Sequence, residues 1–259
     1  MDSYEISNGF NKYFRNIGQT LAKKFNKDSN MNFRYYLNNP KKDSMFCEPL
    51  EAEELCKLIE NLNVKKYPGP DGFGPKLIKE IAPLIFQPVL YLFNLSLSTG
   101  SFPDKLKLAK VIPIFKKGDK YLPSNYRPIS LLSTFSKLLE KVMYKRLYLY
   151  LQGNNILYRY QFGFRKNHST ALALIDVVDS IYQYLDHNET VIGLYMDLQK
   201  AFDTVNHKIL MQKLNNYGVR GIVLDWLNSY LSGRKQFTTV NNCDSEIITI
   251  NCGVLQAMY

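Results

Sequence analysis

The sequence has little of what disulfide-linked, zinc-binding or membrane-spanning chains require. Its 259 residues contain four cysteines and three histidines, and no two cysteines form a Cys-x-x-Cys pair. This scatter predicts reduced thiols in an intracellular protein without a structural zinc site. It does not distinguish the nucleus from the cytoplasm. The sequence contains no run of about 18 apolar residues, so no membrane span is predicted. The polar, acidic start from Met1 to Phe10 is unlike a signal peptide.

Acidic residues are almost absent from the middle of the chain. Between Lys105 and Lys166 there are fourteen Lys or Arg residues and two acids, Asp119 and Glu140, so this segment carries +12. The rest of the chain sums to −2, which makes the basic charge regional. A basic region interleaved with Tyr, Phe and Leu suits a phosphate backbone. A solvated basic face without a partner would have the same composition.

Apolar residues are plentiful, at 46% with 19 Tyr and 15 Phe, and their spacing predicts helices with a few strands. An amphipathic stretch runs from Phe10 to Phe25, and a stiff turn from Tyr67 to Gly72. Helices are predicted at 50–62, 75–82, 84–98, 134–152, 169–185, 205–216 and 221–232, and strands at 109–115, 191–196, 236–240 and 247–252.

One predicted strand ends in a carboxylate. The run from Val191 to Met196 is apolar throughout, which is typical of a strand covered on both faces, and Asp197 follows it directly. A buried charge is costly unless it is paired or bound to a metal. Asp197 is therefore either a cap at the edge of the sheet or a metal ligand.

The residues that follow resemble a known family. The stretch 197–203, Asp-Leu-Gln-Lys-Ala-Phe-Asp, resembles the first catalytic motif of reverse transcriptases from non-LTR, jockey-like retrotransposons. Further family motifs match in order along the chain, at 67–72, 111–118, 126–132, 161–165 with 169–170, 229–234 and 253–256. The resemblance covers about residues 48–256.

This resemblance implies an α+β fold, with the fingers and first part of the palm of a right-hand polymerase, mostly helical with a small antiparallel sheet. It divides the chain into an N-terminal extension (1–47), a basic fingers-type region (48–190) and an incomplete palm (191–259). The family extends a DNA primer on an RNA template, using deoxynucleoside triphosphates and two Mg²⁺ ions. No membrane partner is expected.

The resemblance also assigns roles to individual residues. Asp197 and the Leu198 carbonyl would bind metal, and Phe202 would exclude the ribose 2′-hydroxyl unless it is only a core aromatic. Nucleotide or template contacts are expected from Arg165, Lys166 and Gln256, and nucleic-acid contacts from Arg127, Lys137, Lys141 and Lys145. The bland alternative for these cations is a solvated basic turn or helix face. Apart from the resemblance, the position of Asp203 before Thr204 predicts that it caps the next helix, with metal binding as the alternative.

The chain departs from the family pattern near its end. The family continues Gly-Val-Pro-Gln-Gly-Ser and later Tyr-x-Asp-Asp, whereas this sequence has Leu255, Ala257 and Met258 and then ends at Tyr259. One carboxylate and one carbonyl do not hold two Mg²⁺ ions, so this chain alone is expected to be inactive. An unpaired edge beside Asp197 would also lower solubility. Two alternatives are a non-enzymatic nucleic-acid-binding remnant and an unrelated helical interaction protein.

Overall fold

The structure is a computed structural model that describes residues 2–22, 33–37, 40–198 and 200–254. The chain forms two compact units, the first made of residues 1–146 and 200–259 and the second of residues 147–199. The first unit joins the two ends of the sequence, because its N-terminal helix packs against strands near the C-terminus. This division differs from the three consecutive segments expected from the sequence.

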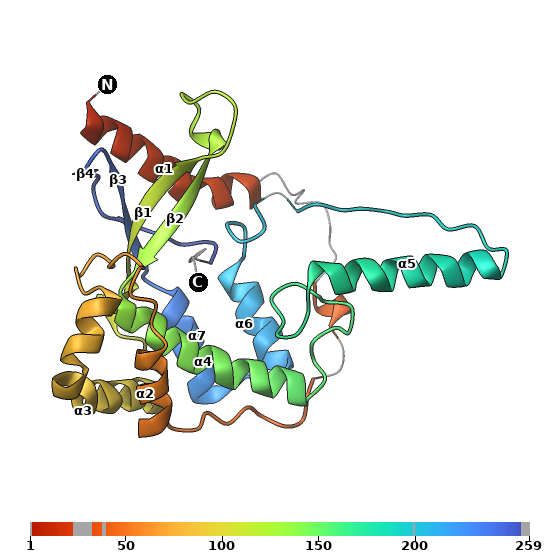
Figure 1. The fold of residues 1–259 in the computed structure, drawn as a ribbon, viewed down its shortest axis with the longest axis horizontal. Coiled ribbons are helices and arrows are strands. Elements are labelled where there is room, and N and C mark those ends of the chain that lie inside the picture. Colours follow the sequence, from red (N-terminus) through yellow and green to blue (C-terminus); the bar gives the residue numbers. More distant parts are fainter. Residues whose placement is uncertain (1, 23–32, 38–39, 199, 255–259) are drawn as a thin grey trace. The chain divides into compact units, whose positions relative to one another are not determined.

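The first unit combines helices with a small sheet, which confirms the α+β class (Figure 1). Its helices are α1 (Ser3–Ala22), α2 (Ala52–Glu60), α3 (Pro75–Thr99), α4 (Thr134–Gly153, which continues into the second unit), α6 (His207–Asn216) and α7 (Gly221–Leu231). Its strands are β1 (Leu108–Phe115), β2 (Tyr126–Leu132), β3 (Lys235–Val240), β4 (Cys243–Asp244) and β5 (Ile248–Thr249). Single 3-10 turns lie at Phe33–Tyr36, Asp104–Lys107 and Pro123–Asn125.

The sheet has the strand order β2-β1-β3-β4, with β5 also paired to β3. It is mixed, since β1 runs antiparallel to β2 but parallel to β3. The sequence predicted β1 but missed β2, because Pro128 made residues 125–130 read as the approach to a helix. Pro128 is tolerated in β2 because β2 is an edge strand, where a missing N–H breaks no inner ladder.

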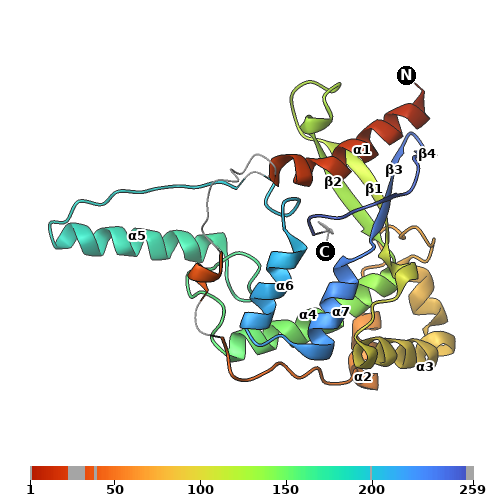
Figure 2. The same ribbon diagram turned by 180° about the vertical axis from the view of Figure 1, so that it is seen from behind.

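The core of the first unit lies where α3, α4 and α7 meet the sheet. Trp226 of α7 is 1% exposed and contacts Phe102 edge-on at 5.2 Å between ring centroids. The Trp226 indole N–H donates to the Ser96 hydroxyl at 2.9 Å, so its one polar group is satisfied inside the core. Figure 2 shows α6 and α7 running beside each other, and these two helices are in contact.

Helix α3 replaces the two helices predicted at 75–82 and 84–98. Pro83 and Pro88 lie inside it, and each removes one backbone hydrogen bond. The helix continues because its buried face, including Ile78 and Phe93, packs on α2 and α7. By length and composition alone α3 is apolar enough to cross a membrane, although it contains no uninterrupted apolar run of that length; the core helix of a soluble protein meets the same criterion.

The turn at 67–72 is fixed against the junction of β2 and α4. Gly69 is buried there, and a Cβ atom on it would lie 2.5 Å from the carbonyl carbon of Leu132 and from the backbone nitrogen of Ser133. Asp71 accepts hydrogen bonds from the Ser133 hydroxyl at 2.5 Å and from the Phe73 N–H at 3.2 Å. Only glycine therefore fits position 69 without moving the backbone.

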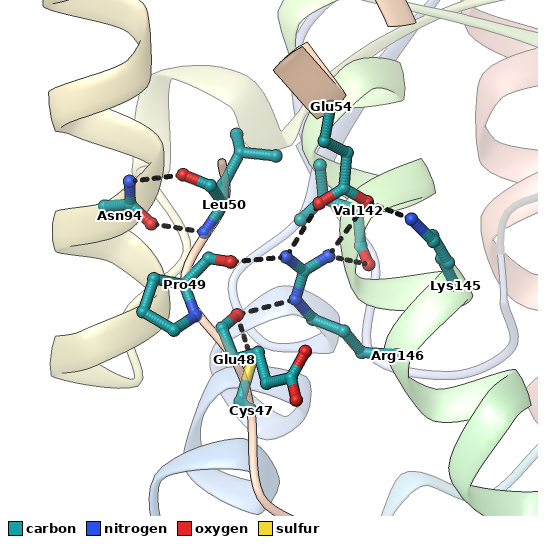
Figure 3. Close-up of polar contacts among 9 residues, drawn as sticks. All are labelled: Cys47, Glu48, Pro49, Leu50, Glu54, Asn94, Val142, Lys145 and Arg146. Carbon is teal, nitrogen blue, oxygen red and sulfur yellow. Dashed lines mark hydrogen bonds and ion pairs between the residues drawn. The ribbon is translucent and has the colours of Figure 1, made fainter. Parts of the chain in front are cut away.

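Arg146 ties the segment before α2 to α4, and we call its contacts the Arg146 clasp (Figure 3). Its guanidinium donates to both carboxylate oxygens of Glu54, at 3.3 and 3.0 Å. It also donates to the backbone carbonyls of Glu48 at 2.7 Å and Pro49 at 2.8 Å. Partial burial acts to raise the pKa of the Glu54 carboxyl, but the bonds and charges of Arg146 and Lys145 outweigh it and hold that pKa below its ordinary value.

The second unit contains α5 (Thr170–Asp186) and no other full helix among its described residues. The Ser169 hydroxyl accepts from the Leu172 N–H at 3.2 Å and so caps the start of α5, the helix that was predicted at 169–185. None of the residues of α5 is buried, although many are apolar. Its polar residues Asp176, Asp179, Gln183 and Asp186 recur at spacings of three and four and share one side, so the opposite, apolar side of α5 is exposed among the described residues.

Candidate active site

The strand expected before Asp197 does not form. Residues 191–198 are extended and pair with no strand among the described residues. Their apolar side chains face solvent, with Ile192 and Tyr195 each 89% exposed. The prediction of a buried strand was wrong, because an apolar run becomes a strand only when a neighbouring strand offers backbone hydrogen bonds. Asp197 and Leu198 are thus exposed and lie in the second unit.

The residues that follow form a compact turn in the first unit, from Lys200 to Asn206. Within it, the N–H groups of Asp203 and Thr204 both donate to the Lys200 carbonyl, at 2.9 and 3.2 Å. We call this segment the 200–206 turn. It carries Phe202, whose side chain is 39% exposed and is therefore not a buried core aromatic.

Residues 252–254 hold the 200–206 turn through backbone hydrogen bonds. The Val254 N–H donates to the Phe202 carbonyl at 2.9 Å, and the Gly253 N–H donates to the Val205 carbonyl at 3.0 Å. Gly253 has φ +83°, and a Cβ atom there would lie 2.8 Å from the Asp203 carbonyl oxygen. Glycine is needed at this position both for its backbone angle and for this close approach.

Asp203 does not cap the next helix, so that prediction was wrong. Helix α6 begins at His207, and Asn206 is its N-cap residue, accepting from the Ile209 N–H at 3.2 Å. Asp203 lies three positions too early to reach these N–H groups. Burial raises the pKa of the Asp203 carboxyl, and the charge of Lys200 only partly offsets this.

Two findings about other proteins bear on this geometry. The family model described as reverse transcriptase (RNA-dependent DNA polymerase) matches residues 114–256, which include β1 from Ile114, the 200–206 turn and the segment that holds it. The chain belongs to the reverse transcriptase family. It is 33% identical over 227 residues to a probable RNA-directed DNA polymerase from transposon BS of Drosophila melanogaster.

Other relatives place this reverse transcriptase chain among the jockey-like, non-LTR retrotransposons. It is 30% identical over 221 residues to the RNA-directed DNA polymerase from mobile element jockey of Drosophila funebris. It is 32% identical over 197 residues to a Pol polyprotein from retrotransposable element R1 of Bradysia coprophila, covering 73% of this chain and 18% of that protein. The two former alignments cover 85% of this chain but 24% of each relative, so the chain spans about a quarter of their length.

The basic residues expected at the nucleotide are in the second unit of the reverse transcriptase chain. Arg165 donates to the Tyr158 carbonyl at 3.1 Å, while its Nε atom is buried without a hydrogen-bond partner. Lys166 is exposed on the same turn. The backbone of this turn has positive φ at Phe164 (59°) and Asn167 (61°), which fixes its shape. Gln256 lies outside the described residues.

The basic residues expected at nucleic acid lie in the first unit. Arg127 is exposed on β2, opposite Ile114 of β1. Lys145 is paired with Glu54 at 2.9 Å and so belongs to the edge of the Arg146 clasp. Lys137 is half-buried, and burial followed by the nearby charge of Lys66 lowers the pKa of its amine.

Lys137, Lys141 and Lys145 are spaced four apart on α4, so they lie on one face as predicted. Their surroundings differ along that face. Lys145 has a carboxylate partner, whereas the charge of Lys141 acts with that of Lys66 to lower the pKa of Lys137.

The reverse transcriptase family uses divalent metal ions, and the described residues of this chain do not by themselves fit two of them. No group of three or more His, Cys, Asp or Glu side chains that could hold a metal occurs among them. Asp197 offers one exposed carboxylate beside the Leu198 carbonyl. Two hard cations require several oxygen ligands at once.

Sequence reasoning gave no role to the contacts that fix the 200–206 turn. Gly253 and Val254 belong to a stretch that resembles a family motif, but this resemblance did not predict which residues they contact. Gly18 of α1, which contacts the same turn, gave no signal beyond its place in an amphipathic stretch. Helical spacing predicts which face of α1 is covered but not what covers it.

Proposed function

We propose that this chain forms the nucleotide-facing front of an RNA-directed DNA polymerase. In this proposal Asp197 and the Leu198 carbonyl are ligands of Mg²⁺, and Phe202 restricts the ribose 2′-position of the incoming nucleotide. Arg165, Lys166 and Gln256 contact the triphosphate or the template, and Arg127, Lys137, Lys141 and Lys145 contact nucleic acid. The substrates are an RNA template, a DNA primer and deoxynucleoside triphosphates.

One observation carries the proposal. The first catalytic motif and the Gly253-Val254 motif are about fifty residues apart in the sequence, yet the Val254 N–H donates to the Phe202 carbonyl at 2.9 Å. This bond is formed by backbone atoms, so it fixes the position of Phe202 without using its side chain. A partly exposed phenyl ring on a fixed backbone suits selection by shape.

These 259 residues are not expected to extend a primer on their own. Asp197 is the one carboxylate of the first motif that is expected to bind metal, and two Mg²⁺ ions need further carboxylates. We therefore expect the isolated chain to bind primed RNA without extending the primer. Extension would require more metal ligands than the described residues bring together.

A chimera tests the roles of individual residues in an active setting. Residues 191–254 would replace the corresponding span of the jockey polymerase from Drosophila melanogaster, which is 32% identical over 222 residues. Primer extension on an RNA template is expected to survive the exchange and to be abolished by Asp197→Asn. Asp225→Asn removes an exposed carboxylate in the same span and serves as the matched control.

The same chimera tests the gate. Phe202→Val should raise the use of ribonucleotides relative to deoxynucleotides, and that ratio is independent of how much active protein is present. An active chimera in which Asp197→Asn retains full extension would refute the metal-ligand role. An unchanged nucleotide ratio in Phe202→Val would refute the gate.

The isolated chain tests the expectation of inactivity. Mg²⁺-dependent extension by the purified chain, above that of the Asp197→Asn variant, would contradict it. RNA affinity that falls steeply with salt, without extension, agrees with the proposal. That result alone also fits a nucleic-acid-binding remnant, which the chimera separates, because a remnant has no reason to keep a functional Asp197.

A further inference from the structure

Helix α1 presents one face of small and polar residues to the rest of the first unit. Ser7, Asn11 and Gly18 are buried and are spaced at four and seven residues, which places them on the same side of the helix. The distance along the axis from Ser7 to Gly18 is about 16 Å, at about 1.5 Å per residue. This face is therefore long enough to contact both the strands near the C-terminus and the 200–206 turn.

The start of this face is fixed to the strands near the C-terminus. The Asn11 side-chain amide donates to the Ser245 hydroxyl at 2.8 Å and to the Glu246 carbonyl at 2.7 Å. Its oxygen accepts from the Gln236 side chain at 3.0 Å. The Ser7 hydroxyl reaches the Cys243 carbonyl at 2.8 Å. These buried polar groups satisfy one another's hydrogen bonds only when α1 lies in this register on the strands.

The end of the face rests on the 200–206 turn. A Cβ atom on Gly18 would collide with the carbonyl oxygen of Asp203 and would lie 3.0 Å from its carbonyl carbon and 3.5 Å from the Cys252 sulfur. The backbone of α1 thus touches the backbone of the turn directly. The turn is also bonded to Gly253 and Val254, so two elements hold it.

We propose that α1 positions the 200–206 turn, and that Gly18 is a positioning residue for Phe202. The helix is anchored at Asn11, and Gly18 lets its far end lie against Asp203 closely enough to fix the turn. Without this contact the turn keeps its hydrogen bonds from residues 252–254. The link from the turn to nucleotide selection rests on the function proposed above, whereas the contact itself does not.

Two substitutions in the same helix test the contact. Gly18→Ala and Gly9→Ala both add one methyl group and the same helix propensity. A Cβ on Gly9 meets nothing within 4 Å, so only Gly18→Ala disturbs the turn. Hydrogen exchange is measured at the amides of Asp203, Gly253 and Val254. We expect exchange about tenfold faster or more in Gly18→Ala, with no change in Gly9→Ala.

The Cys252 thiol gives a second readout. Its sulfur lies 3.5 Å from the carbonyl oxygens of Asp203 and Val205, so loosening the turn should expose it. Alkylation at each cysteine is followed by peptide mass spectrometry. Gly18→Ala should speed alkylation of Cys252 and leave the exposed Cys56 unchanged. Equal Cys252 rates in the two glycine variants would overturn the proposal.

A measurement on the unmodified chain covers the case in which Gly18→Ala does not fold. In low concentrations of urea, the amides of α1 and those of the 200–206 turn should exchange with the same dependence on urea, because they open together. Opening of α1 with the turn still protected would overturn the proposal.

Equilibrium dialysis with dTTP and UTP then separates the two proposals. Gly18→Ala should lower the preference for dTTP, while Gly9→Ala keeps it. An unmodified chain that binds neither nucleotide counts against the proposed function and leaves the exchange result to decide the role of α1.

Discussion

Removing Arg146 should destabilise the first unit far more than removing its neighbour Lys145. The Arg146 side chain is 9% exposed and that of Glu54 is 17% exposed, whereas that of Lys145 is 59% exposed. Losing one partner of a buried pair costs about 3–5 kcal/mol. Since Glu54 keeps Lys145 and some water contact, we expect about 3 kcal/mol for Arg146→Ala. Losing an exposed pair costs about 0–1 kcal/mol, which we expect for Lys145→Ala.

Urea unfolding followed by tryptophan fluorescence measures this difference in the right unit. Trp226 is the only tryptophan in the sequence and is buried in the first unit, so its emission reports that unit. With a slope of about 2–3 kcal/mol per molar urea, 3 kcal/mol lowers the midpoint by about 1–1.5 M. The double variant Arg146→Met/Glu54→Gln should recover part of the loss, because no unpaired charge remains. Coinciding midpoints for Arg146→Ala and Lys145→Ala would refute the reasoning.

Five further outcomes are expected. The stability that ionised Glu54 contributes is present above its ordinary pKa of 4.5 and is lost as pH falls through its lowered folded value, so the unfolding midpoints of wild type and Glu54→Gln should converge as pH falls below 4.5. Gly69→Ala should lower thermal stability by about 3 kcal/mol, since its Cβ meets backbone that has no room to move. Asn206→Ala should cost about 1 kcal/mol in urea unfolding. Asp203→Asn should raise stability at pH 7 because it removes a half-buried charge whose pKa is raised, and a loss of stability in Asp203→Asn would contradict this reasoning. In filter binding, Arg165→Ala should reduce the slope of log affinity against log salt for RNA by about 0.7–0.9, and an unchanged slope would argue for a solvated turn.

Most helices could be predicted because their signals are local. The periodicity of α2, α4, α5 and α7 lies within each segment, and the structure places these helices within about two residues of the expected ranges. Helix α3 differed from its prediction, because whether Pro83 ends a helix depends on what the residues around it pack against. Local propensity cannot weigh a lost hydrogen bond against tertiary packing.

Strands were harder to predict because a strand depends on its neighbour. Residues 191–196 have the apolar content of a buried strand, but no described segment pairs with them. Residues 126–132 contain a proline and nevertheless form β2, because β1 offers them a complete antiparallel partner. In both cases the deciding information lies elsewhere in the chain.

The candidate site was predictable as a set of residue types but not as an arrangement. The resemblance identified Asp197 and Phe202 and the motif that contains Val254. It did not indicate that Val254 bonds to Phe202 or that Asn206, rather than Asp203, caps α6. The three-residue error for the cap arose because the length of the 200–206 turn depends on its contacts with residues 252–254.

The bond between Asn11 and Glu246 spans 235 residues of sequence and has a consequence for synthesis. At about 5–20 residues per second, a ribosome adds that length in roughly 10–50 seconds. Throughout this interval α1 exists in the nascent chain without the strands that satisfy Asn11. Within the first unit, α1 is therefore synthesised well before the strands that fix its register, and its position is among the last features of that unit to be set.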